Sequence, residues 1–368
     1  MPERLPRYRT KDRQLDQALV GILDAVGASA NRDQLFELLV TVVRLATDET
    51  DRLDLKIANA ALKELRYAFK VFAPYREVPK VTIFGSARTL PDDPLYAQAR
   101  SFATSIADAG WMVVTGAGPG IMAAGLEGAG RARSFGINIR LPFEQGANPY
   151  IAADPKLIEM KYFFTRKVAL VKESSAFVVL PGGFGTLDEL MELLTLLQTG
   201  KAEPAPIVCL EVPGGNYWHG WRNFLETEVA TRGLISPEDD SLLTVTDDVA
   251  VAVRHIQNFY RNYDSIRFVG DLLIIRLRAA PTEAELDALT AEFGDICTEG
   301  GIEATEPLPP EVADNDLLDL PRVSLQFDRM HFGRLRMLID ALNALPSAPS
   351  EVPRPTRPFP GAGTDETG

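Results

Sequence analysis

Short apolar runs alternate with helical stretches between residues 80 and 211, and three of these runs end in a glycine-rich turn. The predicted strands are 80–84, 111–115, 136–140, 176–180 and 206–211. This alternation is typical of a parallel sheet with helices on both faces. Ligands of such folds bind at the carboxyl ends of the strands, where the turns at Gly85, Gly116 and Gly182 fall. We therefore predict an α/β fold with a site built from these turns.

The turn after the strand at 176–180 carries the most specific signal. It reads P-G-G-F-G-T-L-D-E from Pro181 to Glu189 and opens an apolar helix. Its glycines let the backbone approach a ligand closely, and the unpaired N–H groups at a helix start attract an anion. The predicted phosphate contacts are Gly182, Gly183, Gly185 and Thr186. Because Arg166 and Lys167 stand just upstream, we expect chemistry on a phosphorylated small molecule.

The turn after the strand at 111–115 is less specific. It reads G-A-G-P-G, a G-x-G-x-G spacing that differs from the G-x-G-x-x-G of dinucleotide-binding folds. No acidic residue ends the next strand, 136–140, in the position that holds a ribose in NAD-binding proteins, so we do not expect NAD. The loop alone fits a phosphate or sugar site, or only a tight turn. Its candidate contacts are Gly116, Gly118 and Gly120.

These motifs together resemble the LONELY GUY (LOG) family of nucleoside 5′-monophosphate phosphoribohydrolases, which are often mislabelled lysine decarboxylases. The similarity covers roughly Pro79 to Tyr263, as in a long bacterial form with extensions at both ends. Besides the two glycine turns, the segments that carry it are Gly85–Arg88, Leu141–Gln145, Asn148–Tyr150 and Thr165–Lys167. The resemblance implies a Rossmann-like fold.

The resemblance also implies roles for particular residues. Arg166 matches the catalytic arginine of the family's R-K pair, and Glu189 matches the catalytic glutamate that ends the P-G-G-x-G-T-x-x-E motif. Ser86 and Arg88 would contact the nucleotide, and the protein would be at least a homodimer with its site near the subunit boundary. Many bacterial members carry an acidic residue where this chain has Ala123, a departure that bears on base or ribose specificity rather than on the reaction class.

Each of these residues also has a simpler structural interpretation. Thr186 and Glu189 fit a capping box, in which the threonine caps the helix and the glutamate reaches back to the cap. In that case Thr186 is a cap rather than a phosphate ligand. Ser86 and Arg88 fit ordinary turn residues.

The segment from Tyr162 to Glu173 is predicted as a helix, on which Arg166 and Lys167 fit solvated surface charges. The apolar neighbours Phe163, Phe164, Val168 and Leu170 indicate instead that part of the segment is packed, so that Arg166 needs a partner. We therefore expect a functional role for Arg166 and leave Lys167 open.

The predicted reaction is hydrolysis of the N-glycosidic bond of a nucleoside 5′-monophosphate, such as AMP or a cytokinin-type nucleotide, to free base and ribose 5-phosphate. Glu189 would stabilise an oxocarbenium-like transition state or orient the attacking water. Arg166 would anchor the substrate or stabilise the departing base. No metal or organic cofactor is expected. The alternatives are a non-enzymatic nucleotide-binding or nucleotide-sensing protein on the same fold, and a pyridoxal-phosphate decarboxylase, for which no lysine has the required setting.

The net charge and the cysteine content limit which partners and which cellular compartment we expect. The formal net charge of −13 disfavours duplex nucleic acid as a partner. The two cysteines, Cys209 and Cys297, form neither a disulfide framework nor a zinc motif, which suits a reducing cytoplasm. We expect no signal peptide and no membrane span, because the first residues are charged and long apolar runs are missing.

Four segments are predicted along the chain. They are a helical extension at 1–78, a catalytic domain at 79–263, a small α+β domain at 264–345 and a disordered tail at 346–368. Within the third segment, the pattern predicts a hairpin or strand at 267–277, a strand at 323–327 and helices over 282–293 and 332–345, with Thr282 as a cap.

Overall fold

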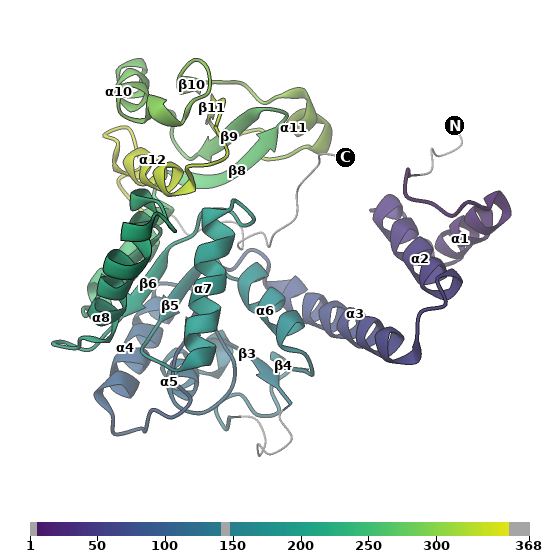
Figure 1. Cartoon of the computed structure of the whole chain (residues 1–368), viewed down its shortest axis with the longest axis horizontal. Helices are drawn as coiled ribbons and strands as arrows, with labels where there is room; N and C mark the ends of the chain where they lie inside the picture. The colour runs from purple at the N-terminus through teal and green to yellow at the C-terminus, as the bar shows by residue number, and fades with distance from the viewer. Residues whose placement is uncertain (1–5, 141–147, 353–368) are drawn as a thin grey trace. The chain divides into compact units, whose positions relative to one another are not determined.

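A computed structural model describes residues 6–140 and 148–352 of the chain (Figure 1). It contains two compact units, Met1–Lys63 and Glu64–Gly368. Two expectations from the sequence lie outside the described residues: the similarity at Leu141–Gln145 and the tail beyond residue 352. The predicted boundaries of the four segments stay predictions.

The described part of the first unit is helical, as expected for the extension predicted at 1–78. Its helices are α1 (Arg13–Ala25), α2 (Arg32–Thr47) and the beginning of α3 (Arg52–Phe72). Asp12 caps α1 by accepting hydrogen bonds from the backbone of Gln14 and Leu15, which satisfies two N–H groups at the helix start. A small core joins α1 and α2 through Leu19, Leu23, Phe36 and Val40.

The second unit is built on a seven-stranded parallel sheet with the order β4-β3-β2-β1-β5-β6-β7. Its strands are β1 (Lys80–Phe84), β2 (Met112–Thr115), β3 (Ser134–Ile139), β4 (Leu157–Met160), β5 (Ala176–Val179), β6 (Ile207–Leu210) and β7 (Leu243–Thr246). The five predicted strands are confirmed, whereas β4 and β7, the two edge strands, were not foreseen. The central strands β1, β2 and β5 are buried along their whole length and mostly apolar, because helices cover both of their faces.

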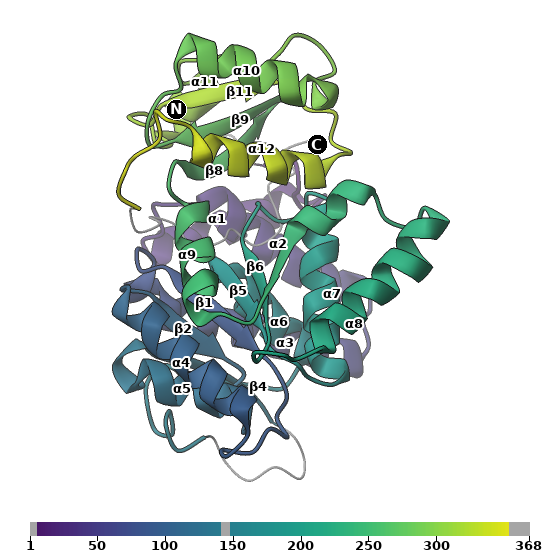
Figure 2. The same cartoon turned by 90° about the vertical axis from the view of Figure 1, so that its left-hand side faces the viewer.

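Helices cover both faces of this sheet (Figures 1 and 2). One face carries α4 (Pro94–Asp108), α5 (Ile121–Ala129) and α9 (Val249–Phe259). The other carries α6 (Phe163–Lys172), α7 (Phe184–Gln198), α8 (Tyr217–Phe224) and the end of α3. The structure thus confirms the predicted α/β architecture. No helix among the described residues is both long and apolar enough to cross a membrane.

A four-stranded antiparallel sheet, ordered β10-β11-β9-β8, follows α9. Its elements are β8 (Tyr263–Val269), β9 (Leu272–Leu277), α10 (Glu283–Phe293), β10 (Glu303–Ala304), α11 (Pro309–Asp314), β11 (Arg322–Leu325) and α12 (Phe332–Ala344). Thr282 caps α10 in a capping box with Glu285, as expected. One continuous cluster of buried apolar side chains runs from Val81 in β1 to Leu338 in α12, so this sheet shares a core with the parallel sheet.

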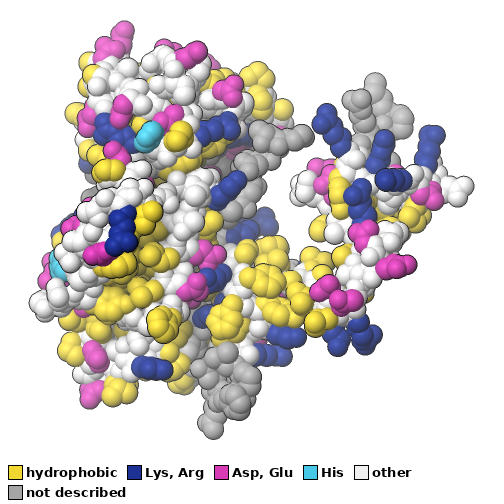
Figure 3. Space-filling model, viewed as in Figure 1, with side chains coloured by type: hydrophobic (Ala, Val, Ile, Leu, Met, Phe, Trp, Pro, Cys, Tyr) yellow, Lys and Arg dark blue, Asp and Glu magenta, His cyan; other side chains and the backbone are white. Residues whose placement is uncertain are grey.

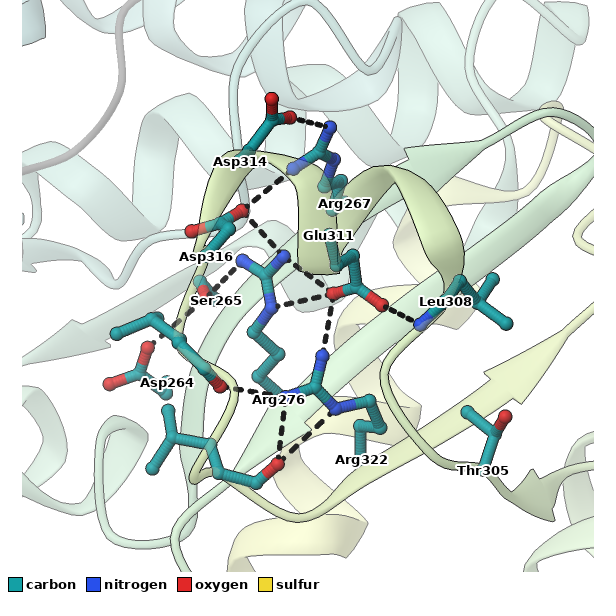
Figure 4. A network of polar contacts seen from close by, with 12 residues as sticks. Asp264, Ser265, Arg267, Arg276, Thr305, Leu308, Glu311, Asp314, Asp316 and Arg322 are labelled. Carbon is teal, nitrogen blue, oxygen red and sulfur yellow. Dashed lines mark hydrogen bonds and ion pairs between the residues drawn. The ribbon is translucent and has the colours of Figure 1, made fainter.

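Buried charges hold α11 against the antiparallel sheet (Figure 4). One carboxylate oxygen of Glu311 accepts hydrogen bonds from Arg276 and Arg322, each at 2.7 Å. The other accepts from the backbone of Leu308 at 3.1 Å. Asp316 adds a second carboxylate to Arg276, also at 2.7 Å. All three charged groups on the central contact are buried, so each depends on the others to offset its lost hydration.

Candidate active site

The three glycine turns lie next to one another at the carboxyl ends of the central strands of the parallel sheet. Strands β2, β1 and β5 are neighbours, so the turns that follow them adjoin at their carboxyl ends. Ser86, in the turn after β1, joins the other two through its backbone. Its N–H donates to the carbonyl of Pro181 at 3.3 Å, and its carbonyl accepts from the N–H of Ile121 at 3.0 Å.

Close backbone packing at this edge explains two of the glycines. Gly120 has a φ of +65°, and a Cβ there would meet the carbonyl oxygen of Ser86 at 2.3 Å. A Cβ on Gly116 would lie 1.9 Å from a guanidinium nitrogen of Arg166. The glycines of the turn after β2 are therefore required by the close approach of the turn after β1 and of the Arg166 side chain.

Arg166 lies between the turn after β2, strand β3 and helix α7. Its Nε donates to the carbonyl of Ile137 in β3 at 2.8 Å. One terminal nitrogen lies 3.8 Å from the carboxylate of Glu189 in α7. Both side chains are largely buried, with 10% and 15% of their surface exposed. The structure thus brings together the two residues predicted to be catalytic, although their roles stay predictions.

Glu189 is a poorly stabilised carboxylate. Burial raises its pKa from the usual value near 4.5 to about 7, although the nearby charges of Arg166 and Lys167 oppose this change. Among the described residues, no hydrogen-bond donor lies within reach of this carboxylate; the Arg166 contact is longer than a hydrogen bond. A group with this pKa changes charge near neutral pH, which is typical of acid–base and electrostatic roles in catalysis.

The capping-box interpretation of this helix is wrong. Helix α7 begins at Phe184 with Gly183 as its N-cap, so Thr186 stands inside the first turn and Glu189 beyond it. Within the described part of the chain, no side chain caps α7. Helix α5, with Gly120 as its N-cap, likewise receives no side-chain cap from the described residues. N–H groups at a helix start that lack a side-chain cap can bind an anion, although in α5 the first of them, that of Ile121, already donates to the Ser86 carbonyl.

The other predicted contacts lie around this edge with different surroundings. Gly183 and Gly185 are exposed, and a Cβ added to either would meet none of the described atoms within 4 Å. Gly182 packs against Thr186, and Gly118 packs against the side chain of Met122. The loop surface at 183–185 therefore has room for a ligand.

Ser86, Arg88 and Lys167 have partners within the chain. The Ser86 hydroxyl accepts a hydrogen bond from the backbone N–H of Arg88 at 3.0 Å, a turn contact, and Arg88 is exposed. Lys167 forms ion pairs with Asp188 at 2.8 Å and Glu192 at 2.7 Å, which link α6 to α7. Nucleotide contacts by these three residues stay predictions.

The prediction that part of helix α6 is packed is confirmed, although Phe163, Phe164 and Val168 are not among its buried residues. Their exposed fractions are 55%, 51% and 46%, whereas Arg166 is buried. Helix α6 turns the polar residue inward because the sheet edge supplies partners for it there. Of these apolar neighbours, only Leu170 is buried as expected.

Sequence reasoning did not assign a role to Asn148, which forms a hydrogen bond to the turn after β2. Its side-chain amide donates to the carbonyl of Gly118 at 2.9 Å, and its side-chain oxygen accepts from the N–H of Tyr150 at 3.0 Å. The only signal was its place in the Asn148–Tyr150 segment of the family resemblance.

Comparisons with known proteins place this site in a family context. Residues 120–256 match the family model described as "Possible lysine decarboxylase". This segment includes Arg166, the loop at 182–186 and Glu189. The match confirms the resemblance to the LONELY GUY family that the motifs predict.

The chain is similar to curated plant proteins of that family. It is 32% identical over 101 residues to the Arabidopsis thaliana cytokinin riboside 5′-monophosphate phosphoribohydrolase LOG7, a match covering 27% of this chain and 45% of that protein. For LOG1 of the same plant, the identity is 31% over 101 residues, with 27% and 46% covered. The chain thus spans less than half the length of these relatives.

Two solved structures are also similar. One is the molybdenum cofactor binding protein from Rippkaea orientalis, with 19% identity and a TM-score of 0.35, covering 48% of this chain and 94% of that one. The other is the molybdenum cofactor carrier protein from Chlamydomonas reinhardtii, with 22% identity, a TM-score of 0.35 and the same coverage.

Proposed function

We propose that this protein hydrolyses the N-glycosidic bond of nucleoside 5′-monophosphates, releasing the free base and ribose 5-phosphate. The observation that carries the proposal is the buried Arg166–Glu189 pair, 3.8 Å apart, beside the uncapped glycine loop at the start of α7. The names of the plant relatives, which act on cytokinin riboside 5′-monophosphates, support the same substrate class. AMP and cytokinin-type nucleotides are the candidate substrates.

In the proposed mechanism, the loop at 182–186 binds the substrate, and Arg166 and Glu189 act on the bond that breaks. Residues 182–186 hold the 5′-phosphate, so that binding energy from a group remote from the reacting bond positions the sugar. As the bond between C1′ and the base nitrogen breaks, its electron pair leaves with the base, and positive charge develops on the sugar. The ionised Glu189 stabilises this charge or orients the water that attacks C1′. Arg166 anchors the substrate or stabilises the departing base.

We further propose that the working form is at least a homodimer. The neighbouring helices α6 and α7 present large exposed apolar side chains close to the site (Figure 3). They are Phe163, Phe164, Val168, Phe184 and Met191. Several large apolar side chains exposed on neighbouring helices are typical of an interface. Light scattering tests this part: a dimer or larger assembly is expected, and a fully active monomer contradicts it.

The experiment that tests the proposed reaction is incubation with a panel of nucleoside monophosphates, with chromatographic detection of released base. AMP should be cleaved far faster than adenosine, because only AMP carries the group that the loop binds. Glu189→Gln is the control for contaminating activity. Binding of AMP without release of base would contradict the proposal and favour the non-enzymatic nucleotide-binding alternative.

A further inference from the structure

A tyrosine from outside the recognised motifs contacts the phosphate loop. The hydroxyl of Tyr217 donates a hydrogen bond to the carbonyl of Gly182 at 2.7 Å. Tyr217 is the first residue of α8, which follows β6, whereas Gly182 follows β5. A tyrosine hydroxyl is a protonated donor at neutral pH, and burial raises the pKa of Tyr217 further.

Buried groups hold Tyr217 in place. The carboxylate of Glu211, just after β6, accepts hydrogen bonds from the backbone of Tyr217 at 2.9 Å and of Trp218 at 3.4 Å, at the start of α8. The Tyr217 ring packs edge-on against Trp218, with the ring centroids 4.8 Å apart. Trp218 is fully buried, and its indole N–H donates to the carbonyl of Leu210. These contacts fix the position of the Tyr217 ring and therefore of its hydroxyl group.

The contact fixes the orientation of one peptide group. In a planar trans peptide, the carbonyl and the N–H point in opposite directions, so holding the Gly182 carbonyl also aims the N–H of Gly183. Two consecutive glycines resist rotation of the peptide between them less than other residue pairs do, because neither has a Cβ. Rotation would turn the carbonyl oxygen toward the loop's ligand side and repel an anion there.

We propose that Tyr217 is a positioning residue for phosphate binding, which keeps the Gly182–Gly183 peptide in its anion-binding orientation. The inference rests on the proposed function, because it assigns the phosphate to this loop. Its effect is on affinity for the phosphate-bearing ligand rather than on the chemical step.

Tyr217→Phe tests the inference, with Tyr260→Phe as the matched control. Tyr260 donates the same kind of bond, from its hydroxyl to the carbonyl of Ser175 at 2.6 Å, but at the opposite end of β5. Losing one such bond corresponds to a change of about three- to tenfold in an equilibrium constant. For Tyr217→Phe we expect the KM for AMP and the Kd for ribose 5-phosphate, measured by calorimetry, to rise by about this factor, with kcat nearly unchanged. Tyr260→Phe should lose thermal stability yet keep both constants.

Two outcomes overturn the inference: a Tyr217→Phe variant with wild-type KM and Kd, or one that loses kcat and stability together as a damaged fold would. The calorimetric measurement separates this inference from the proposed reaction. If the wild-type protein releases no base but binds ribose 5-phosphate more tightly than Tyr217→Phe does, the positioning role stands and the proposed reaction fails.

Discussion

Two buried clusters of charge in this molecule differ in how completely their members are paired. In the antiparallel sheet, Glu311 receives hydrogen bonds at 2.7 Å from both Arg276 and Arg322. At the edge of the parallel sheet, Glu189 has Arg166 at 3.8 Å. Both partners of the first carboxylate lie at hydrogen-bond distance, whereas the arginine beside the second lies beyond it.

The two carboxylates accordingly have pKa values displaced in opposite directions. Burial alone would raise the pKa of Glu311, but the hydrogen bonds and charges of its partners lower it. Burial raises the pKa of Glu189 to about 7, because its partners compensate less. Burial of charge is therefore not a sign of function by itself; the supply of donors around a carboxylate decides whether it serves stability or chemistry.

The largest expected effect is on stability, from Glu311→Gln. Without the negative charge, Arg276 and Arg322 lose their shared partner, and breaking a buried pair of this kind costs about 3–5 kcal/mol. Urea denaturation measures the loss. Asp314→Asn, which removes an exposed partner of Arg267, is the control and should cost less than about 1 kcal/mol. Equal losses in both variants would show that the central cluster is no more important than a surface pair.

Glu189→Gln should act in the opposite way, on turnover rather than on stability. Loss of the charge that faces the developing oxocarbenium ion should lower kcat by about a hundredfold or more, equivalent to about 3 kcal/mol of barrier. The free energy of unfolding should not fall and should rise at neutral pH and above, because the variant removes a carboxylate whose pKa burial raises to about 7. A variant with near wild-type turnover would remove Glu189 from the mechanism.

The pH dependence should differ in sign between the two clusters. Base release should increase as the pH rises through about 7, because Glu189 acts in its ionised form. The contribution of Glu189 to stability is present below the unfolded pKa and is lost as the pH rises through the folded value. The contribution of Glu311 is present above its unfolded pKa and is lost as the pH falls through its lowered folded value.

Denaturation at several pH values, with Glu189→Gln and Glu311→Gln in parallel, separates these contributions. Each variant should flatten only its own part of the profile. A rate profile without an inflection near neutral pH would contradict the assignment of Glu189 as the ionised group.

The smallest effect is expected for Lys167→Met. Because Lys167 already pairs with Asp188 and Glu192, we expect the KM for AMP to change less than about twofold and stability to fall by less than about 1 kcal/mol. A clear rise in the KM for AMP would show that Lys167 leaves its carboxylate partners to bind the phosphate.

The sequence predicted the central strands better than the edges of the sheet. Strands such as β1 and β5 are buried throughout and mostly apolar because both faces are covered, and their glycine turns mark where they end. The edge strands β4 and β7 are partly exposed, so their residues carry a weaker apolar pattern. Neither was foreseen.

The site was predicted through motifs, but its geometry was not. Periodicity gave α6 an apolar side without showing that Phe163 and Phe164 face outward while Arg166 faces the sheet edge. The capping-box pattern failed because Gly183 starts α7 before Thr186 is reached. Tyr217 carries no local signal, since its contact with Gly182 depends on β6 lying next to β5.

The core shared by the two sheets has a consequence for how this chain can vary. Because the antiparallel sheet packs its apolar residues into the core of the parallel sheet, it cannot be removed as an independent domain. Cutting the chain after Tyr263 would strip the cover from Ile256 and Phe259 in α9, which lie in that common cluster. The described residues from Glu64 onward should therefore unfold in a single transition.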